Sequence, residues 1–210
     1  LLARHLNDPH PVLRSMVREG YLTYSREPQY EAVILEILRN ALAGDDWRGQ
    51  EQASLLMAVL DRKEAAPRLV ELLKSNRDEV MVASAWALRV LSVPETAPGI
   101  LSQVQARGEQ PSINEPGIGY QIAHMSEALA VLHHRPSLDV LRKFIPKTDK
   151  YHPVARAGAI YAIGLILEDV GQDAPPPVPQ ETTALSQAAS LLGLKKTQTD
   201  FALATELCDE

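Results

Sequence analysis

The sequence predicts an all-α protein, and three observations support that prediction. Hydrophobic residues make up 45% of the 210 residues, which is enough for a substantial core, while aromatic residues make up only 5%. Alanine and leucine are abundant, and both favour helices over the strands that Val, Ile, Thr and Tyr prefer. Apolar residues also recur at helical spacing through most of the chain.

The charge and the cysteine content exclude several other classes. A formal net charge of −6 disfavours general binding to nucleic-acid phosphates, unless basic residues gather on one face. The single cysteine, Cys208, excludes an internal disulfide and a zinc site of the usual thiolate kind. We find no apolar run long enough to span a membrane and no secretory leader. Because the sequence begins at Leu1 rather than at methionine, we expect a fragment of a longer polypeptide. Because no targeting signal is visible, we expect a cytoplasmic location.

An internal repeat organises the middle of the chain. Residues 51–75 and 82–106 superpose at an offset of 31, which pairs Leu60 with Leu91 and Pro67 with Pro98. Residues 122–146 form a third copy at a further offset of 41. Self-similarity at such a period is typical of solenoid and array architectures. The predicted units lie near 5–43, 46–75, 77–106, 120–146 and 150–170.

Each unit reads as a pair of amphipathic helices. In the segment VMVASAWALRVL the expected buried stripe is Val80, Ala83, Ala87, Val90 and Leu91, and in LVELL it is Leu69, Leu72 and Leu73. Neither helix can bury its stripe alone, so neighbouring pairs must stack. The sequence therefore predicts an α-solenoid of about five helical hairpins.

The repeated segments resemble a known family. The stretches DPHPVLRSMV (8–17), HPVARAGAIYAIG (152–164) and EAAPRLVELL (64–73) are similar to the HEAT repeat, in particular to its short variant named after phycobilisome lyases. The resemblance covers about residues 5–170. It implies a fold rather than a function: a right-handed superhelix of HEAT-like helical hairpins whose second helices line a concave surface. Two units depart from the pattern: Val82, and Ala123 or His124, stand where the family has arginine.

The phrases HPVLR (10–14) and HPVAR (152–156) occupy the same slot in the first and fifth units. In each copy we expect proline to start a helix, histidine to lie in the capping region and valine to begin the buried stripe. We expect the arginine to bond a carboxylate, such as Asp8 or Asp149, together with backbone carbonyls, and so to clamp adjoining units. These expectations concern Pro11 and Pro153, His10 and His152, Val12 and Val154, and Arg14 and Arg156.

Histidine chemistry is the alternative interpretation of these phrases. His10 and His152 lie at opposite ends of the array, so they cannot meet in one monomer. The pair His133 and His134 falls in a turn, where adjacent side chains splay apart, and chelation would need a further ligand such as His124. We therefore predict no metal site and no cofactor.

No catalytic constellation is visible, and we predict that the chain is not an enzyme. A HEAT-like iron hydroxylase would need His-Glu pairs, and none occurs. A zincin helix, a phosphate loop and a nucleophile elbow are also absent. Cys208 lies in the acidic segment ELCDE, which would raise its thiol pKa.

Three features stand apart from the regular repeat: a basic segment, a loop and the two tryptophans. The basic segment 135–150 reads as a solvated face, with an acidic protein partner or a nucleic-acid backbone as the alternative. The loop 107–119, with Asn114 and Glu115 near its apex, breaks the repeat and reads as a tolerated insertion or a recognition loop. Trp86 is expected in the core, whereas Trp47 begins a helix and is either an interface anchor or a staple against its own helix.

The C-terminal part of the sequence differs in composition. Residues 171–180 (GQDAPPPVPQ) form a proline-rich spacer that ends the array. Residues 181–210 have helical spacing and are predicted to be a helical cap or a degenerate repeat.

We therefore expect a scaffold or adaptor module that binds a protein partner on its second helices. The expected contact residues are Arg68, Glu71, Gln103, Arg142, Lys143, Asn114, Glu115 and Trp47. The alternatives are a phycobilisome-lyase-like or chaperone module for a tetrapyrrole-carrying protein and, less favoured, nucleic-acid binding. The sequence predicts neither the partner's identity nor the oligomeric state.

Overall fold

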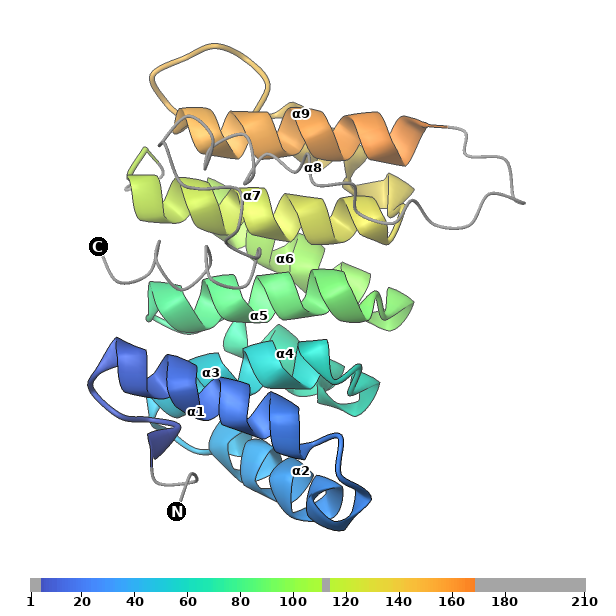
Figure 1. Ribbon diagram of the computed structural model, residues 1–210. Helices are drawn as coiled ribbons and strands as arrows, with labels where there is room; N and C mark the ends of the chain where they lie inside the picture. Colours follow the sequence, from blue (N-terminus) through green and yellow to red (C-terminus); the bar gives the residue numbers. More distant parts are fainter. Residues whose placement is uncertain (1–4, 111–113, 169–210) are drawn as a thin grey trace, which may run out of the picture. The chain divides into compact units, whose positions relative to one another are not determined.

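The computed structural model describes residues 5–110 and 114–168, and in this part of the chain every regular element is helical (Figure 1). The all-α prediction is confirmed. The α-helices are α1 (Pro11–Tyr24), α2 (Pro28–Ala43), α3 (Trp47–Val59), α4 (Ala66–Leu72), α5 (Asp78–Leu91), α6 (Ala97–Gly108), α7 (Pro116–Val131), α8 (Leu138–Arg142) and α9 (Pro153–Leu167). The predicted spacer at 171–180 and cap at 181–210 lie outside the described residues.

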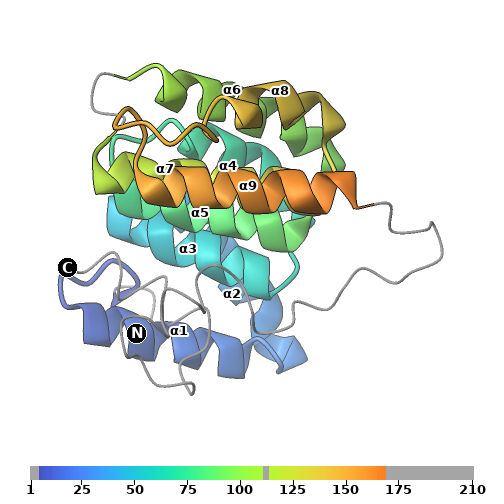
Figure 2. The same ribbon diagram turned by 90° about the horizontal axis from the view of Figure 1, so that it is seen from above.

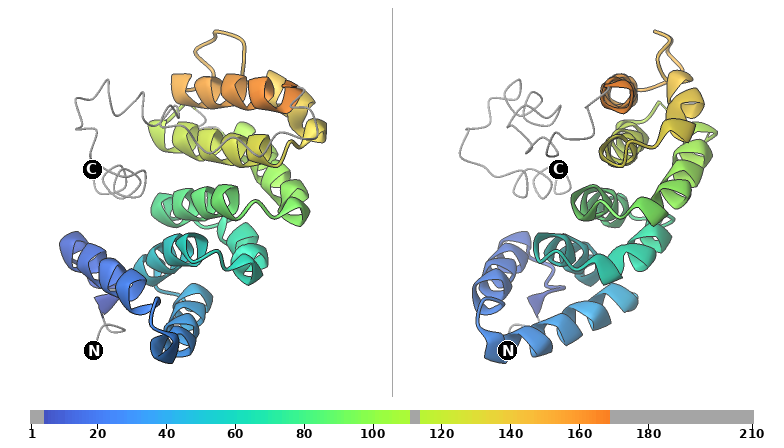
Figure 3. Two further views of the ribbon diagram at one scale, coloured as in Figure 1. Left: turned by 45° about the vertical axis from the view of Figure 1, so that its right-hand side comes forward. Right: turned by 90° about the vertical axis from the view of Figure 1, so that its right-hand side faces the viewer.

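The chain divides into two compact units, Leu1–Gln103 and Val104–Glu210, and each is described by itself. In the first unit, α3 packs against α5 and α2, and more lightly against α1, as Figure 3 shows. The α4 helix packs against α5. Fully buried aliphatic side chains from successive helices fill the spaces between them, among them Leu38, Leu55, Leu69 and Leu88.

In the second unit, α7 and α9 lie side by side, and α8 packs against α9 (Figure 2). A glycine permits the close approach of the two long helices. A Cβ atom added at Gly158 of α9 would lie 2.6 Å from the Ala123 Cα of α7. The core of this unit also contains Ile122, Leu129 and Leu141.

Three turns between paired helices, α3–α4, α5–α6 and α7–α8, share a local geometry. Asp61, Ser92 and His133 each have a positive φ, of 52°, 48° and 47°. Short 3₁₀-helices follow at Lys63–Ala65, Pro94–Thr96 and Arg135–Ser137. Left-handed residues are a common way to end a helix, because they turn the chain and satisfy its last carbonyls. The intervals between these turns are the 31 and 41 residues at which the sequence segments superpose.

Most predicted helix starts and stripes are confirmed. Pro11 and Pro153 occupy the first turns of α1 and α9. The buried residues include Leu69, Leu72, Leu73, Val80, Ala83, Ala87 and Leu91, and Trp86 is buried as expected.

Two valines assigned to the buried stripes are exposed. Val12 is 58% exposed, because the buried face of α1 is set by Arg14, Val17 and Tyr21, and Val12 lies on the opposite side of the helix. Val90 is 43% exposed, because it lies in the last turn of α5, beyond the continuously buried residues 80–88. Val154 of α9 is half-buried.

The loop predicted at 107–119 is shorter than expected. Helix α6 continues to Gly108, and α7 already begins at Pro116, directly after the extended residue Glu115. Proline is suited to the first turn of a helix, and the glycines that suggested a loop lie inside α7. One of them, Gly119, is buried where a Cβ atom would lie 2.7 Å from the His152 Nδ1.

Candidate functional site

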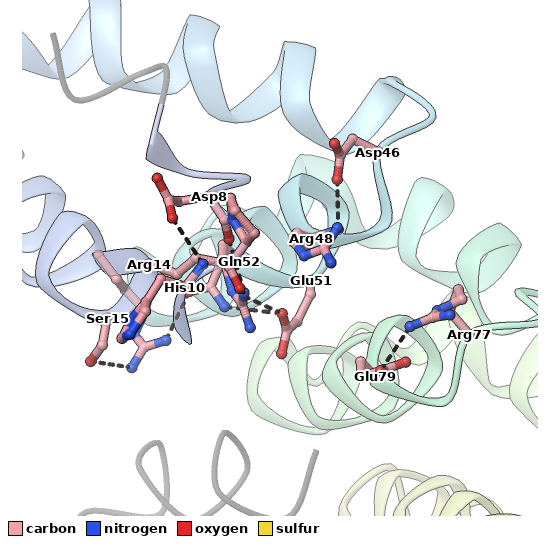
Figure 4. Close-up of polar contacts among 12 residues, drawn as sticks. Asp8, His10, Arg14, Ser15, Asp46, Arg48, Glu51, Gln52, Arg77 and Glu79 are labelled. Atoms are coloured by element: carbon pink, nitrogen blue, oxygen red, sulfur yellow. Dashed lines mark hydrogen bonds and ion pairs between the residues drawn. The ribbon is translucent and has the colours of Figure 1, made fainter. Parts of the chain in front are cut away.

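Charged and amide side chains lie buried between α1 and α3 in the first unit (Figure 4). Arg14 and Arg18 come from one face of α1, whereas Glu51 and Gln52 come from α3, and none is more than 2% exposed. The Arg14 Nε lies 3.8 Å from Glu51 Oε2. The Arg18 Nη1 donates to Gln52 Oε1 at 2.8 Å, and Gln52 Nε2 donates to Glu51 Oε2 at 3.1 Å. We call these four residues the α1–α3 polar cluster.

Burial changes the electrostatics of this cluster. Desolvation lowers the pKa of Arg18 to about 10, although the carboxylates of Glu19 and Glu51 act in the opposite direction. Arg18 therefore remains a cation at neutral pH, and it is stabilised by Gln52 and by a hydrogen bond from Nη2 to Ser15 Oγ at 3.2 Å. Removing one partner of a buried charge leaves the other uncompensated, so the cluster fixes how α1 lies on α3.

The first predicted arginine clamp involves different partner atoms from those expected. The Arg14 Nη1 donates to the backbone carbonyls of Asp8 and Pro9, at 2.9 and 3.3 Å, while its carboxylate partner is Glu51. The Asp8 carboxylate instead accepts from the His10 backbone N–H at 2.8 Å. That bond, together with the His5 imidazole, lowers the pKa of Asp8. Arg14 thus connects the segment before α1 to Glu51 of α3, so it joins the first helical pair to the second as predicted.

The second repeated phrase, HPVAR at 152–156, makes different contacts from the first. The His152 Nδ1 accepts from the Val154 backbone N–H at 3.3 Å, so this histidine caps α9 as the sequence predicted. Its ring also lies 6.4 Å from that of Tyr120, centroid to centroid. Within the described residues, no hydrogen bond or ion pair joins Arg156 to Asp149, which is exposed. The expected clamp at Asp149 is therefore wrong.

Trp47 lies at the start of α3, directly after the capping residue. The Asp46 carboxylate accepts from the Arg48 backbone N–H at 3.0 Å. The Trp47 ring is half-buried, with the guanidinium carbons of Arg48 and Arg77 at 4.3 and 4.2 Å from its centroid. Such distances are in the range of cation–π attraction. The indole is thus partly covered by one arginine of its own helix and by one that precedes α5, and both the staple and the anchor stay predictions.

The predicted contact residues of the first unit differ in exposure and in the hydrogen bonds that they already make. Arg68 is half-buried at the start of α4, and its Nε donates to the Leu42 carbonyl at the end of α2, at 3.1 Å. Its Nη1 also donates to Glu71 Oε2 at 2.8 Å, so the structure brings these two predicted residues together. Glu71 is exposed, and Gln103 on α6 is half-buried. Arg68 therefore has a structural role, whereas Glu71 is available for contact.

The predicted contact residues of the second unit are exposed. Asn114 and Glu115 immediately precede α7. At the end of α8, Arg142 donates to Asp139 Oδ1 at 2.9 Å, and Lys143 follows it. An exposed i,i+3 pair of this kind contributes little to stability, so its charges can be redirected to a partner.

The paired histidines occupy a structural turn. His133 is exposed in the left-handed conformation, and His134 is half-buried, with its backbone N–H donating to the Leu129 carbonyl at 3.1 Å. In the described ranges, no group of three or more His, Cys, Asp or Glu side chains has an arrangement that could hold a metal ion. Cys208 lies outside those ranges.

Two groups of residues were missed by the sequence reasoning. One is the set of Arg18, Glu51 and Gln52, which completes the α1–α3 polar cluster around the predicted clamp residue Arg14. The i,i+4 spacing of Arg14 and Arg18 on the face shared with Val17 could have revealed it. The other is apolar and exposed: Tyr30 and Val33 on α2 are 45% and 56% exposed. The Tyr30 ring makes an edge contact with that of Tyr24 at 5.7 Å.

Comparisons with known proteins identify no relative. No protein-family model, no curated protein sequence and no solved structure matches the chain. Among the described residues, no helix is long and apolar enough to cross a membrane.

Proposed function

We propose that the chain is a HEAT-like α-solenoid module that binds a protein partner on its second helices. These are the later members of each helical pair: α2, α4, α6 and α8. The module's role would be that of a scaffold or adaptor.

The repeated turn supports the solenoid part of the proposal. A helix that ends on a left-handed residue, a 3₁₀-helix and a second helix recur at the intervals found in the sequence. Units that share such a local design and bury apolar stripes against their neighbours are the building blocks of helical arrays. Small residues at the helix contacts, such as Gly158 against Ala123, allow the helices to approach closely.

The observation that carries the binding part is the contrast in burial between the first and second helices of the three middle pairs, α3–α4, α5–α6 and α7–α8. In the first unit, every residue from 49 to 58 of α3 and from 80 to 88 of α5 is buried. In the second unit, every residue from 121 to 130 of α7 is buried. A helix covered on all sides has no surface to offer, so in these three pairs the exposed faces of α4, α6 and α8 remain for a partner.

The exposed residues of α2 have the chemistry of an interface. Tyr30 and Val33 are apolar and accessible, and tyrosine is enriched among residues that dominate binding energy. Ion pairs connect α2 to the next pair of helices: Arg62 bonds Glu31, and Arg39 Nη2 donates to Glu64 Oε1 at 3.1 Å. These pairs hold α2 in place beside the α3–α4 turn and leave Tyr30 and Val33 exposed.

Recovery of a partner in a pulldown tests the proposal. We would compare the wild-type chain with a variant carrying Glu71→Lys, Arg142→Glu and Lys143→Glu, which spares Arg68 because of its bond to Leu42. A matched control also carries three charge reversals with the same change in net charge, at Glu168 after α9 and at Lys147 and Lys150 after α8, which are all exposed and outside the second helices. The proposal predicts lost recovery for the first variant and unchanged recovery for the control.

Two other results would redirect the assignment. If both variants recover the partner as well as the wild type does, the second helices are not part of the binding surface. A bilin-induced absorbance change, or a salt-sensitive mobility shift with DNA, would support the tetrapyrrole or the nucleic-acid alternative instead.

A further inference from the structure

Three arginines surround one tryptophan at the start of α3. The guanidinium carbons of Arg48 and Arg77 lie 4.3 and 4.2 Å from the centroid of the Trp47 ring, and that of Arg14 lies 5.9 Å away. Arg48 belongs to the first turn of α3, Arg77 directly precedes α5, and these two helices pack against each other (Figure 4). We call these four residues the Trp47 arginine cluster. Because like charges repel one another, each cation of the cluster is expected to have an anionic partner.

Two of the three cations have carboxylate partners. The Arg14 Nε lies 3.8 Å from Glu51 Oε2, and the Arg77 Nη2 lies 3.1 Å from Glu79 Oε1. The Arg48 guanidinium, in contrast, makes no ion pair and no hydrogen bond with any residue that the structure describes. The cluster therefore has one positive charge without a carboxylate partner in the described part of the chain.

Asp46, the carboxylate nearest to Arg48 along the chain, is already occupied. Its Oδ1 accepts from the Arg48 backbone N–H at 3.0 Å, and its Oδ2 accepts from Asn7 Nδ2 at 3.1 Å. The Arg48 Nε is buried, and no described residue offers it a hydrogen-bond acceptor. A buried donor without an acceptor costs free energy, so its presence needs an explanation. The Arg48 side chain is thus held against the indole rather than against a carboxylate.

The cluster can be reached from solvent. Trp47 and Arg48 are half-buried, and the side chain of Arg77 is 45% exposed. Residues 49–58 of α3, which are all buried, begin directly after Arg48. The cluster therefore lies at the end of α3 that remains accessible, and a ligand can contact the indole and the two arginines without displacing the core.

The chemistry of the cluster selects a carboxylate. A guanidinium presents its N–H donors as a planar fork, which matches the two oxygens of a carboxylate. A carboxylate has one negative charge, which equals the one cation that lacks a partner. A phosphate group carries about −1.5 to −2 at neutral pH, and the nearby carboxylates of Asp46 and Glu79 would repel the excess charge. The indole adds an apolar surface, so an apolar residue next to the acidic one would also find a contact.

We propose that the Trp47 arginine cluster is a binding site for an acidic peptide segment of a protein partner. Arg48 binds the carboxylate of a glutamate or aspartate, Arg77 lies beside it, and the Trp47 ring contacts the neighbouring apolar residue. The site belongs to the starts of α3 and α5 and lies outside the second helices, so either binding proposal can fail without the other.

Nuclear magnetic resonance on the full, isotope-labelled chain tests the site. The probe is the blocked peptide acetyl-Gly-Leu-Glu-Leu-Gly-amide, and its matched control has Gln in place of Glu. The sequence has two tryptophans, so the indole N–H signal of the buried Trp86 serves as an internal reference. We expect the acidic peptide to shift the Trp47 indole signal and the Arg48 Nε–H signal in a saturable way. The amide peptide should leave both signals in place.

A pair of variants assigns the binding to Arg48. Arg48→Gln should weaken binding of the acidic peptide by about tenfold or more, as expected when a hydrogen bond between charged groups is lost. Arg26→Gln makes the same change in net charge at an exposed residue between α1 and α2, and it should bind the peptide like the wild type. Circular dichroism of each variant shows whether it is folded, and the comparison of the two peptides on the wild type needs no variant.

Three results would overturn the proposal. Equal shifts with the acidic and the amide peptide would show that no carboxylate is recognised. Undiminished binding by folded Arg48→Gln would remove Arg48 from the site. Inorganic phosphate that binds the cluster more tightly than the acidic peptide would assign it to phosphate groups instead.

Discussion

Replacing Gly158 with alanine should destabilise the second unit. The added Cβ would lie 2.6 Å from the Ala123 Cα and 2.7 Å from its Cβ. Carbon atoms in contact are normally about 3.5–4.0 Å apart, so α7 and α9 would have to separate by roughly 1 Å. Overpacking of this kind costs about 1–3 kcal/mol. Because the clash involves backbone atoms, no side-chain rotation can relieve it.

Helix propensity acts in the opposite direction and sets the net effect. Alanine gains about 1 kcal/mol over glycine inside a helix. Because the clash is with backbone atoms, we take the upper part of the overpacking range, about 2–3 kcal/mol. After the propensity gain, the free energy of unfolding of Gly158→Ala should fall by about 1–2 kcal/mol. Urea denaturation followed by far-ultraviolet circular dichroism measures it.

A second glycine provides the control. A Cβ at Gly49 of α3 would make ordinary contacts, 3.7 Å from the Asn7 Cβ and 3.8 Å from the Ala41 Cβ. Gly49→Ala should therefore be neutral or stabilising by up to about 1 kcal/mol. If Gly158→Ala is as stable as the wild type, α7 and α9 do not approach as closely as described, and the reasoning is refuted.

Three further substitutions test particular contacts. Tyr21→Phe should raise the unfolding free energy by about 1 kcal/mol, because the Tyr21 hydroxyl is buried without a hydrogen-bond partner among the described residues. Burial raises the pKa of Tyr21 above 10.0, so the unfolded state loses the hydroxyl proton at a lower pH than the folded state does. The stability difference between Tyr21→Phe and the wild type should therefore grow as the pH rises through that value. A difference independent of pH would contradict the burial of this hydroxyl. His133→Gly should be about 1 kcal/mol more stable than His133→Ala in thermal melts, because glycine adopts a positive φ without strain, and equal stability would argue against the left-handed turn. Asp46→Ala should lower stability by about 1 kcal/mol in urea titrations through loss of the α3 cap, whereas Asp45→Ala next to it should have little effect.

Helix positions could be predicted because they depend on local signals. Pro11 and Pro153 fix the start of a helix through their backbone geometry, and the predicted stripe residues Leu69 and Leu73 follow from periodicity alone. The same reasoning failed at Val12, because the identity of the buried face of α1 depends on what α3 presents to it. Arginine and glutamate at that contact replace the apolar pair that periodicity assumes.

The partners of charged side chains could not be predicted from the sequence. Arg14 reaches Glu51, which is 37 residues away along the chain, and Arg68 reaches a backbone carbonyl of the preceding pair. Both contacts depend on how one helical pair lies on the next. For this reason Arg68 was assigned to a partner surface although it stabilises the connection between α2 and α4, while the exposed Tyr30 and Val33 were overlooked.

Deletion of one repeat tests the account's central claim most directly. Removing residues 61–91 joins Leu60 to Ser92, the residue that has the left-handed conformation of Asp61 in the following pair. If the chain is an array of equivalent helical pairs, this variant should remain helical and unfold cooperatively in urea, at reduced stability. A deletion of residues 61–87, which is out of register, should abolish cooperative unfolding. Loss of cooperative folding in both variants would contradict the repeat architecture.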